Sequence, residues 1–372
     1  MRILQVCSAR TLGGGERHLA DLANELARRG HEVYAALVPG SPLPGELAEL
    51  PAERIIELPL RNSLDVASAV KLAQLVRRNQ LEIVHAHLAR DYPLAAFAAR
   101  RDGTRLILTR HVLFPLSRAH RILLRRVARV IAVSQAVADG LIEQDMFAKD
   151  KIVVIHNGVD IKRFEGAKDD GSAKRQRTGA RLCVGMIGEL APIKGQDNFL
   201  RAAAIVTSKH DDADFVIAGE DKSRTGEHRR LLERMIDELR LNQRVRIDGW
   251  ADDVAELLRK FDVFVSASRS ESFGIAMVEA MAAGVPVVAT MTAGAREIID
   301  ADQTGLLAPI EDAEALAAAI CELLDDRNLR EHLGSNALRM VSKQFSLDQM
   351  VARTEQVYRE ALRRDEAGTA AD

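Results

Sequence analysis

The stretch SRSESFGIAMVEAMAAGVPVVAT, residues 268–290, decides the fold of this 372-residue chain. An apolar run typical of a buried strand ends near Ser268, and a polar loop follows it. An apolar helix is then predicted from Phe273 to Ala283, before a second apolar strand, PVVAT (286–290). Strand, helix and strand in this order predict a parallel sheet with helices on both faces.

Two glutamates in this stretch stand out because of where the pattern places them. Glu279 is the one charged residue in GIAMVEAMAAG, so its carboxylate is expected to be buried, at a cost of several kcal/mol unless it is hydrogen-bonded. Paired hydroxyls, as on a ribose, would supply such bonds; a structural ion pair with an Arg or Lys is the alternative. Glu271 precedes the helix, at the carboxyl end of the strand, where doubly wound sheets bind ligands.

The start of the same helix predicts a site for phosphate. The backbone N–H groups of Phe273, Gly274 and Ile275 would open the helix, and a helix N-terminus favours anions. The two carboxylates could bind hydroxyl groups, and the helix N-terminus beside them could bind phosphates. Together they indicate a site for a nucleotide diphosphate joined to a sugar.

The rest of the chain repeats the strand and helix pattern in two blocks. We predict two doubly wound α/β domains that face each other across a crevice, over residues 1–166 and 181–346, with a linker at 167–180. A helix at 347–364 is expected to join the first domain. The predicted strands have the bounds 3–9, 31–38, 82–87, 106–111, 130–134, 151–158, 182–188, 214–219, 244–249, 262–268, 286–290 and 305–308.

Composition narrows the class of partner. Aromatic residues make up 4% of the chain, which argues against a base-stacking nucleic-acid surface, so no nucleic-acid partner is expected. Residues 1–166 hold 24 Lys and Arg residues against 18 Asp and Glu residues, and this excess predicts an anionic partner for the first domain. The start of the sequence lacks a signal-peptide pattern and no apolar run reaches the length of a membrane span. A cytoplasmic location follows as an expectation.

The motifs together resemble the retaining glycosyltransferase family 4, the E-x7-E type with the GT-B fold. Glu271 to Glu279 matches the E-x7-E signature, and GELAPIKG (188–195) resembles the loop that carries the family's cations. TLGGGERHLADLANELARRGHEV (11–33) resembles the N-terminal glycine loop and first helix, and VVIHNGVDIKRF (153–164) the approach to the second domain. The resemblance covers nearly the whole chain.

What this resemblance implies is transfer of a hexose-type sugar from a nucleotide diphosphate sugar to a glycan or glycolipid, as in the synthesis of bacterial surface polysaccharide or lipopolysaccharide. Glu279 would bind the ribose and Glu271 the sugar, while Lys194 would neutralise the leaving diphosphate. His111 would contact the transferred sugar. The donor would also meet the backbone of Phe273, Gly274, Ile275, Gly14 and Gly15, and Gly13 and Arg110 would lie on the acceptor or phosphate side.

Glu189 departs from the family pattern, which has an Arg at this position of the cation loop. Arg10, Arg110 and Arg224 are candidates to supply the missing positive charge. Because of this departure, a sugar-nucleotide-binding subunit without catalysis stays open as an alternative. A nucleotide-sugar epimerase or a phosphorylase on the same fold is another, since a fold does not fix a function.

No cofactor and no metal are expected. The sequence places no Asp-x-Asp pair where it could hold Mg²⁺ against a diphosphate, and His85 and His87 lack a third ligand at helpful spacing, so a structural role is predicted for them. Residues 118–129, rich in Arg among Leu, Ile and Val, are predicted as a basic amphipathic helix. Contact with the anionic inner leaflet of a membrane is one interpretation of this helix, and a solvated face beside a core stripe is the other.

Overall fold

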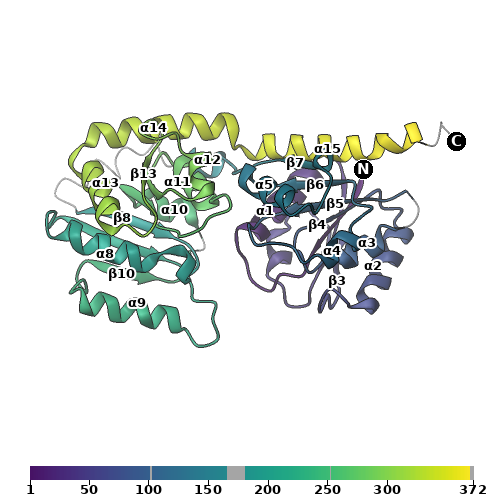
Figure 1. Ribbon diagram of the computed structural model, residues 1–372, viewed down its shortest axis with the longest axis horizontal. Coiled ribbons are helices and arrows are strands. Elements are labelled where there is room, and N and C mark those ends of the chain that lie inside the picture. Colours follow the sequence, from purple (N-terminus) through teal and green to yellow (C-terminus); the bar gives the residue numbers. More distant parts are fainter. Residues whose placement is uncertain (101–102, 166–180, 252, 369–372) are drawn as a thin grey trace. The chain divides into compact units, whose positions relative to one another are not determined.

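The computed structural model describes residues 1–100, 103–165, 181–251 and 253–368, which divide into two compact units (Figure 1). The first unit holds Met1–Gly158 and the chain from Leu347 onward, and the second holds Val159–Ser346. The predicted linker, 167–180, lies outside the described residues. Residues 159–165, assigned to the first domain by sequence, belong to the second unit because Val159 N–H donates to the Phe345 carbonyl at 2.9 Å.

A seven-stranded parallel sheet forms the centre of the first unit. Strand β1 pairs with β2 on one side and with β4 on the other, so the strand order reverses between β1 and β4. In spatial order the strands are β3 (Ile55–Glu57), β2 (Glu32–Leu37), β1 (Arg2–Cys7), β4 (Ile83–Ala86), β5 (Arg105–Arg110), β6 (Arg129–Ala132) and β7 (Ile152–Val154).

Helices cover both faces of this sheet (Figure 1). Helix α1 buries Leu19, Leu22, Ala23 and Leu26, a three-and-four spacing that gives one apolar stripe, and packs beside α15. Gly30, with a φ of +85°, follows the end of this helix, where glycine is favoured. The helices are α1 (Gly14–Arg28), α2 (Val66–Arg78), α3 (Tyr92–Ala98), α4 (Ala119–Leu123), α5 (Gln135–Glu143) and α15 (Leu347–Gly368).

The second unit repeats this design around a six-stranded parallel sheet. The order reverses between β8 and β11. Its strands in spatial order are β10 (Val245–Asp248), β9 (Ala213–Ala218), β8 (Leu182–Ile187), β11 (Val263–Ser266), β12 (Val287–Thr290) and β13 (Leu306–Ala308). Its helices are α6 (Lys162–Glu165), α8 (Gln196–Thr207), α9 (Glu227–Glu238), α10 (Val254–Arg259), α11 (Ile275–Ala282), α12 (Ala293–Ile298), α13 (Ala313–Asp325) and α14 (Arg327–Gln344). The doubly wound fold class is thereby confirmed in each unit.

Two predictions about local structure were wrong or incomplete. The predicted basic helix, 118–129, is helical only at α4, because Leu124 and Val127 are buried in turns and Arg129 is a buried residue of β6. Strand β3 was missed, because at three residues it is too short to carry an alternating pattern. No helix among the described residues is both long and apolar enough to cross a bilayer.

Asp91 is a buried carboxyl group at the start of α3, with no measurable exposure. Its Oδ2 accepts a hydrogen bond from the Ser8 N–H at 2.8 Å, which ties the loop after β1 to α3. Burial nevertheless raises the pKa of Asp91 from 3.8 to about 6. Between these two values the folded protein holds a proton that the unfolded chain has released, so the free energy of unfolding falls as the pH rises.

Asp91→Asn removes this titration, so we expect the stability of the variant relative to the natural protein to rise between pH 3.8 and about 6. A shift of about two pKa units corresponds to about 3 kcal/mol. Urea denaturation of both proteins across this pH range measures the difference between their free energies of unfolding. The titration of all other groups affects both proteins equally and cancels in this difference. A difference that stays constant with pH would contradict the assignment.

Candidate functional site

The carboxyl ends of the strands beside each reversal of order carry the predicted site residues. Parallel strands end at one edge of a sheet, and ligands bind there at the point where the order reverses. In the second unit this edge carries the loops after β8 and β11, which hold Lys194 and Glu271. In the first unit it carries the glycine loop after β1 and the histidines that follow β4 and β5.

Helix α11 begins directly after this edge, at Ile275 rather than at the predicted Phe273. Gly274 precedes it with a φ of +107°, a conformation that favours glycine, and the first bond of the helix is donated by the Met277 N–H. The N–H groups of Gly274 and Ile275 lie before that bond and are not used within the helix. Glu279 is 9% exposed on the second turn, as the apolar surroundings predicted.

Lys194 and Glu271 form an ion pair in the second unit. Lys194 Nζ lies 2.6 Å from Glu271 Oε2, and the two side chains are 29% and 15% exposed. The pair joins the loop after β8 to the loop after β11. A backbone hydrogen bond joins the same two loops, because the Arg269 N–H donates to the Ile193 carbonyl at 2.8 Å. The sequence predicted both residues as ligand-binding but did not predict that they contact each other.

Gly195 is what allows the two loops to approach so closely. Its φ of +68° lies in the left-handed region, and a Cβ at this position would lie 2.0 Å from the Ala267 carbonyl oxygen. Lys194, the preceding residue, ends a short 3-10 helix (Pro192–Lys194). The absence of a side chain at Gly195 therefore holds Lys194 against the end of β11, within reach of Glu271.

A lysine lies close to Glu189, the residue that stands where the family pattern has an Arg. Lys222 Nζ lies 3.9 Å from Glu189 Oε2, and its ammonium is 5.8 Å from the centre of the Trp250 ring. Of the three proposed substitutes, Arg10 and Arg110 lie in the first unit, where they line a pocket, and Arg224 lies in the loop before α9. Lys222 was missed by sequence reasoning, since nothing in its own neighbourhood links it to residue 189.

The glycine loop of the first unit opens α1. Gly13 is the residue before the helix, and Gly14 and Gly15 lie in its first turn. A Cβ at Gly15 would lie 3.5 Å from His111 Cγ, so this turn packs directly against the His111 ring. The loop is therefore adjacent to the predicted sugar-contacting histidine.

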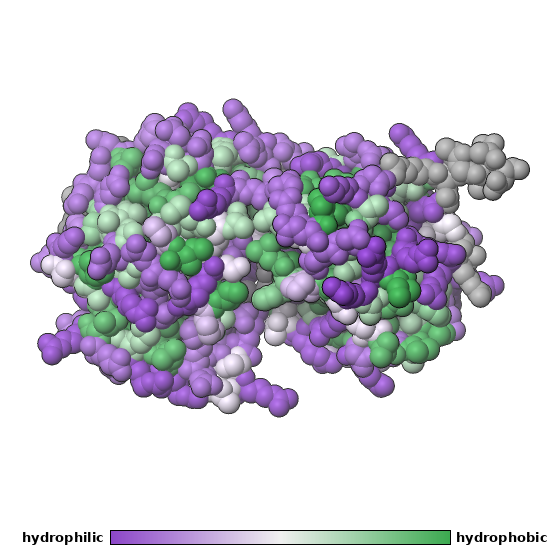
Figure 2. All heavy atoms as spheres, viewed as in Figure 1, coloured by the Kyte–Doolittle hydropathy of each residue, from purple (hydrophilic) through white to green (hydrophobic). Residues whose placement is uncertain are grey.

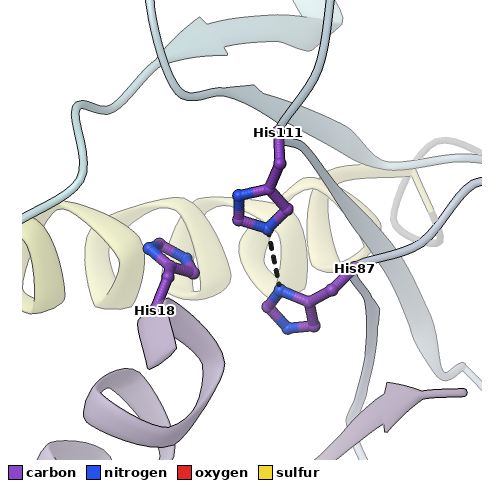
Figure 3. Close-up of side chains that lie close together, drawn as sticks. All are labelled: His18, His87 and His111. Carbon is purple, nitrogen blue, oxygen red and sulfur yellow. Dashed lines mark hydrogen bonds between the residues drawn. The ribbon is translucent and has the colours of Figure 1, made fainter. Parts of the chain in front are cut away.

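Three histidines converge beside this loop (Figure 3). His18 comes from α1, while His87 and His111 follow β4 and β5, and His111 Nε2 lies 3.5 Å from His87 Nδ1. Burial lowers the pKa of His18 to about 4 and holds the pKa values of His87 and His111 well below their usual range. All three imidazoles are therefore neutral at pH 7.

A structural role was predicted for His85 and His87, and both are buried and hydrogen-bonded within the first unit. His85 is bonded through both ring nitrogens, to the Tyr358 hydroxyl at 2.6 Å and to Thr109 Oγ1 at 2.7 Å. His87 faces His111 and lines a pocket. Its neighbours come from other elements of the fold, which spacing along a strand cannot show.

The pocket beside these histidines has a volume of about 570 Å³ and is rich in arginine. Arg90 Nε donates to Ser8 Oγ at 2.5 Å, and Arg110, 6% exposed, donates to the Phe114 carbonyl. The lining is Ala9, Arg10, Thr11, Glu16, His87, Leu88, Ala89, Arg90, Arg110, His111 and Val112. Three guanidinium groups against one carboxylate make this a candidate site for an anionic group.

The aspartate pairs of the chain lie elsewhere. The sequence holds Asp-x-Asp at 212–214 and at 300–302, and these residues precede β9 and β13 or lie at their start. They are thus at the amino edge of the sheet, opposite the edge that carries Lys194. Asp214 pairs there with Arg181 at 2.8 Å.

Comparison with known proteins agrees with this arrangement. Residues 12–163 match the family Glycosyltransferase Family 4, and residues 168–340 match Glycosyl transferases group 1. The chain is 30% identical over 285 residues to the lipopolysaccharide core biosynthesis mannosyltransferase LpcC of Rhizobium leguminosarum bv. viciae, covering 74% of this chain and 78% of that protein. It is 27% identical over 379 residues to the N-acetyl-alpha-D-glucosaminyl L-malate synthase of Bacillus anthracis, covering 96% and 97%.

A solved structure extends the likeness to the fold. The Anabaena protein HepE, in complex with UDP and glucose, gives a TM-score of 0.84 at 25% identity and covers 96% of this chain and 98% of its own. Fold, sites and relatives together define a glycosyltransferase of the GT-B type. More particularly, the chain belongs to glycosyltransferase family 4.

Proposed function

We propose that this enzyme transfers a hexose-type sugar from a nucleotide diphosphate sugar to a glycan or glycolipid, with retention of the anomeric configuration. The observation that carries the proposal is the Lys194–Glu271 ion pair beside the start of α11 and the buried Glu279. A cation, free helical N–H groups and two carboxylates within one strand-end region provide a partner for each part of such a donor. The HepE complex with UDP and glucose supports this class of donor.

Each donor group has a named partner in this proposal. Glu279 binds the ribose hydroxyls, and the N–H groups of Gly274 and Ile275 bind the diphosphate. Lys194 shifts from Glu271 toward the phosphates as they arrive, and Glu271 is then released to accept from sugar hydroxyls. Lys222, beside Glu189, provides a second cation near the cation loop.

The proposed chemistry is front-face substitution. The bond from the anomeric carbon to the diphosphate breaks while the acceptor oxygen bonds to the same face, and the acceptor proton passes to the leaving phosphate. Lys194 and the start of α11 stabilise the charge that develops on the diphosphate. The first unit contributes His111 for the sugar and its arginine-lined pocket for the acceptor.

Mutation of the two glutamates separates their roles. Glu279→Gln removes charged hydrogen bonds, which contribute roughly 1.5–3 kcal/mol each, so we expect it to weaken both UDP and UDP-sugar on the order of tenfold to a thousandfold. Glu271→Gln frees Lys194, so affinity for UDP should be unchanged or higher, while turnover falls. Isothermal titration with UDP and steady-state kinetics with UDP-glucose measure both.

The matched control is Glu297→Gln on α12, a substitution of the same type outside both loops. The assignment fails if Glu271→Gln weakens bare UDP as much as Glu279→Gln does. It fails entirely if neither variant changes the affinity or the turnover.

Turnover is expected to survive removal of divalent metal. The diphosphate is held by Lys194 and α11 in this proposal, and the Asp-x-Asp pairs lie at the opposite edge of the sheet. Transfer activity should therefore be the same in EDTA and in Mg²⁺. Complete loss of activity in EDTA that Mg²⁺ restores would overturn the proposed mechanism.

Residues 112–126 of the first unit supply a surface for an anionic membrane. They expose apolar side chains, including Phe114 at 68% and Ile122 at 74%, beside the exposed Arg125 and Arg126. On the face seen in Figure 2, hydrophobic surface is broken into patches between hydrophilic side chains. Apolar side chains next to arginines favour the interface of an anionic leaflet.

Charge reversal tests this membrane contact. Arg125→Glu combined with Arg126→Glu should weaken sedimentation with phosphatidylserine liposomes by about thirtyfold or more. Loss of two basic residues at about 1 kcal/mol each accounts for about thirtyfold, and repulsion of the two added carboxylates adds to it. Binding of the natural protein should also fall as salt rises. Arg230→Glu with Arg234→Glu on α9 is the control of equal charge. Equal binding by both double variants would refute the contact.

A further inference from the structure

The three converging histidines of the first unit have the arrangement of metal ligands. One nitrogen from each of His18, His87 and His111 lies within 4.8 Å of the others. The rings point toward one shared space from three different elements, as Figure 3 shows.

The distances are close to those of a tetrahedral zinc site. With Zn–N bonds of 2.0–2.1 Å, neighbouring ligand nitrogens are about 3.3 Å apart. His111 Nε2 and His87 Nδ1 are already 3.5 Å apart. The remaining separations, at most 4.8 Å, would have to shorten by about 1.5 Å or less when the metal binds.

Lone pairs are available where the geometry needs them. His87 Nε2 lies 2.8 Å from Gln5 Oε1, and with the amide in this orientation His87 donates from Nε2 and presents the lone pair of Nδ1 to His111. A hydrogen bond from the far ring nitrogen to such an acceptor is the usual support of a metal-bound histidine. His18 Nδ1 is buried and makes no hydrogen bond of ordinary geometry among the described residues, although the Asn157 side chain lies close enough to raise the pKa of His18. His111 becomes a ligand by carrying its proton on Nδ1.

The fourth position of such a site would open into the pocket that His87 and His111 line. Arg10, Arg90 and Arg110 line the same pocket and disfavour an additional positive charge. They favour an anion, such as hydroxide, on the metal. Three histidines with one exchangeable ligand is the composition of an open zinc site.

We propose that His18, His87 and His111 bind one zinc ion, with an exchangeable fourth ligand on the pocket side. This inference goes beyond the proposed function and does not rest on it. Zinc would occupy the nitrogen of His111 that faces the other two rings, so the metal and a sugar that uses that nitrogen would exclude each other. The site is therefore compatible with a transfer reaction that needs no metal.

Direct binding tests the proposal. Titration of ZnCl₂ into the EDTA-treated and dialysed full chain should show one zinc per chain by calorimetry. Co²⁺ in its place should give the visible absorption of a tetrahedral site. Loss of a supporting residue alone weakens metal sites 10–100-fold, so loss of a ligand in His18→Gln or His111→Gln should weaken zinc by about a hundredfold or more.

His332→Gln, an exposed histidine of α14, controls for adventitious binding and should bind zinc as the natural protein does. Circular dichroism verifies that each variant is folded. If His18→Gln does not fold, His111→Gln decides alone, because His111 is the more exposed of the two. Failure of the natural protein to take up zinc, or equal affinity in the folded ligand variants, would overturn the proposal.

Discussion

Parallel pairing of every strand within each sheet is the constraint on which both sites depend. It brings the carboxyl ends of neighbouring strands to one edge, and the reversal of order beside β1 and β8 sends the flanking loops apart, which leaves room for a ligand. Residues distant in sequence, such as Lys194 and Glu271, meet for this reason. The same constraint gathers His87 and His111 beside the glycine loop of the first unit.

The sites nevertheless differ in their charge. In the second unit a cation and a carboxylate neutralise each other at 2.6 Å, so the half-buried groups avoid the cost of an isolated charge. In the first unit the three histidines are neutral, Arg90 donates to Ser8, and Arg110 donates to the Phe114 carbonyl. In the second unit an anionic ligand would therefore bind by replacing Glu271 as the partner of Lys194. In the first unit it would bind guanidinium groups that are already held in place.

The sequence predicted what local pattern determines and missed what only tertiary contact determines. Helix α11 and the burial of Glu279 followed from an apolar run with one charge, and the strands beside them from apolar runs of the right length. The segment 118–129 misled because an arginine-rich apolar pattern fits a helix and equally a turn leading into a buried strand. His18 was overlooked because its partners lie on other elements, and Lys222 because its contact with Glu189 spans two loops.

The ion pair also bears on the choice of mechanism. Movement of the Lys194 ammonium group from Glu271 to the diphosphate, as proposed, would stabilise the leaving group and free the carboxylate for sugar hydroxyls in one step. Glu279 is 9% exposed on a helix that is otherwise apolar, which suits the proposed role of binding ribose hydroxyls. With the two glutamates assigned to hydroxyl groups, the departing phosphate is the group that we propose accepts the acceptor proton. We therefore propose front-face transfer rather than a double displacement through a covalent intermediate.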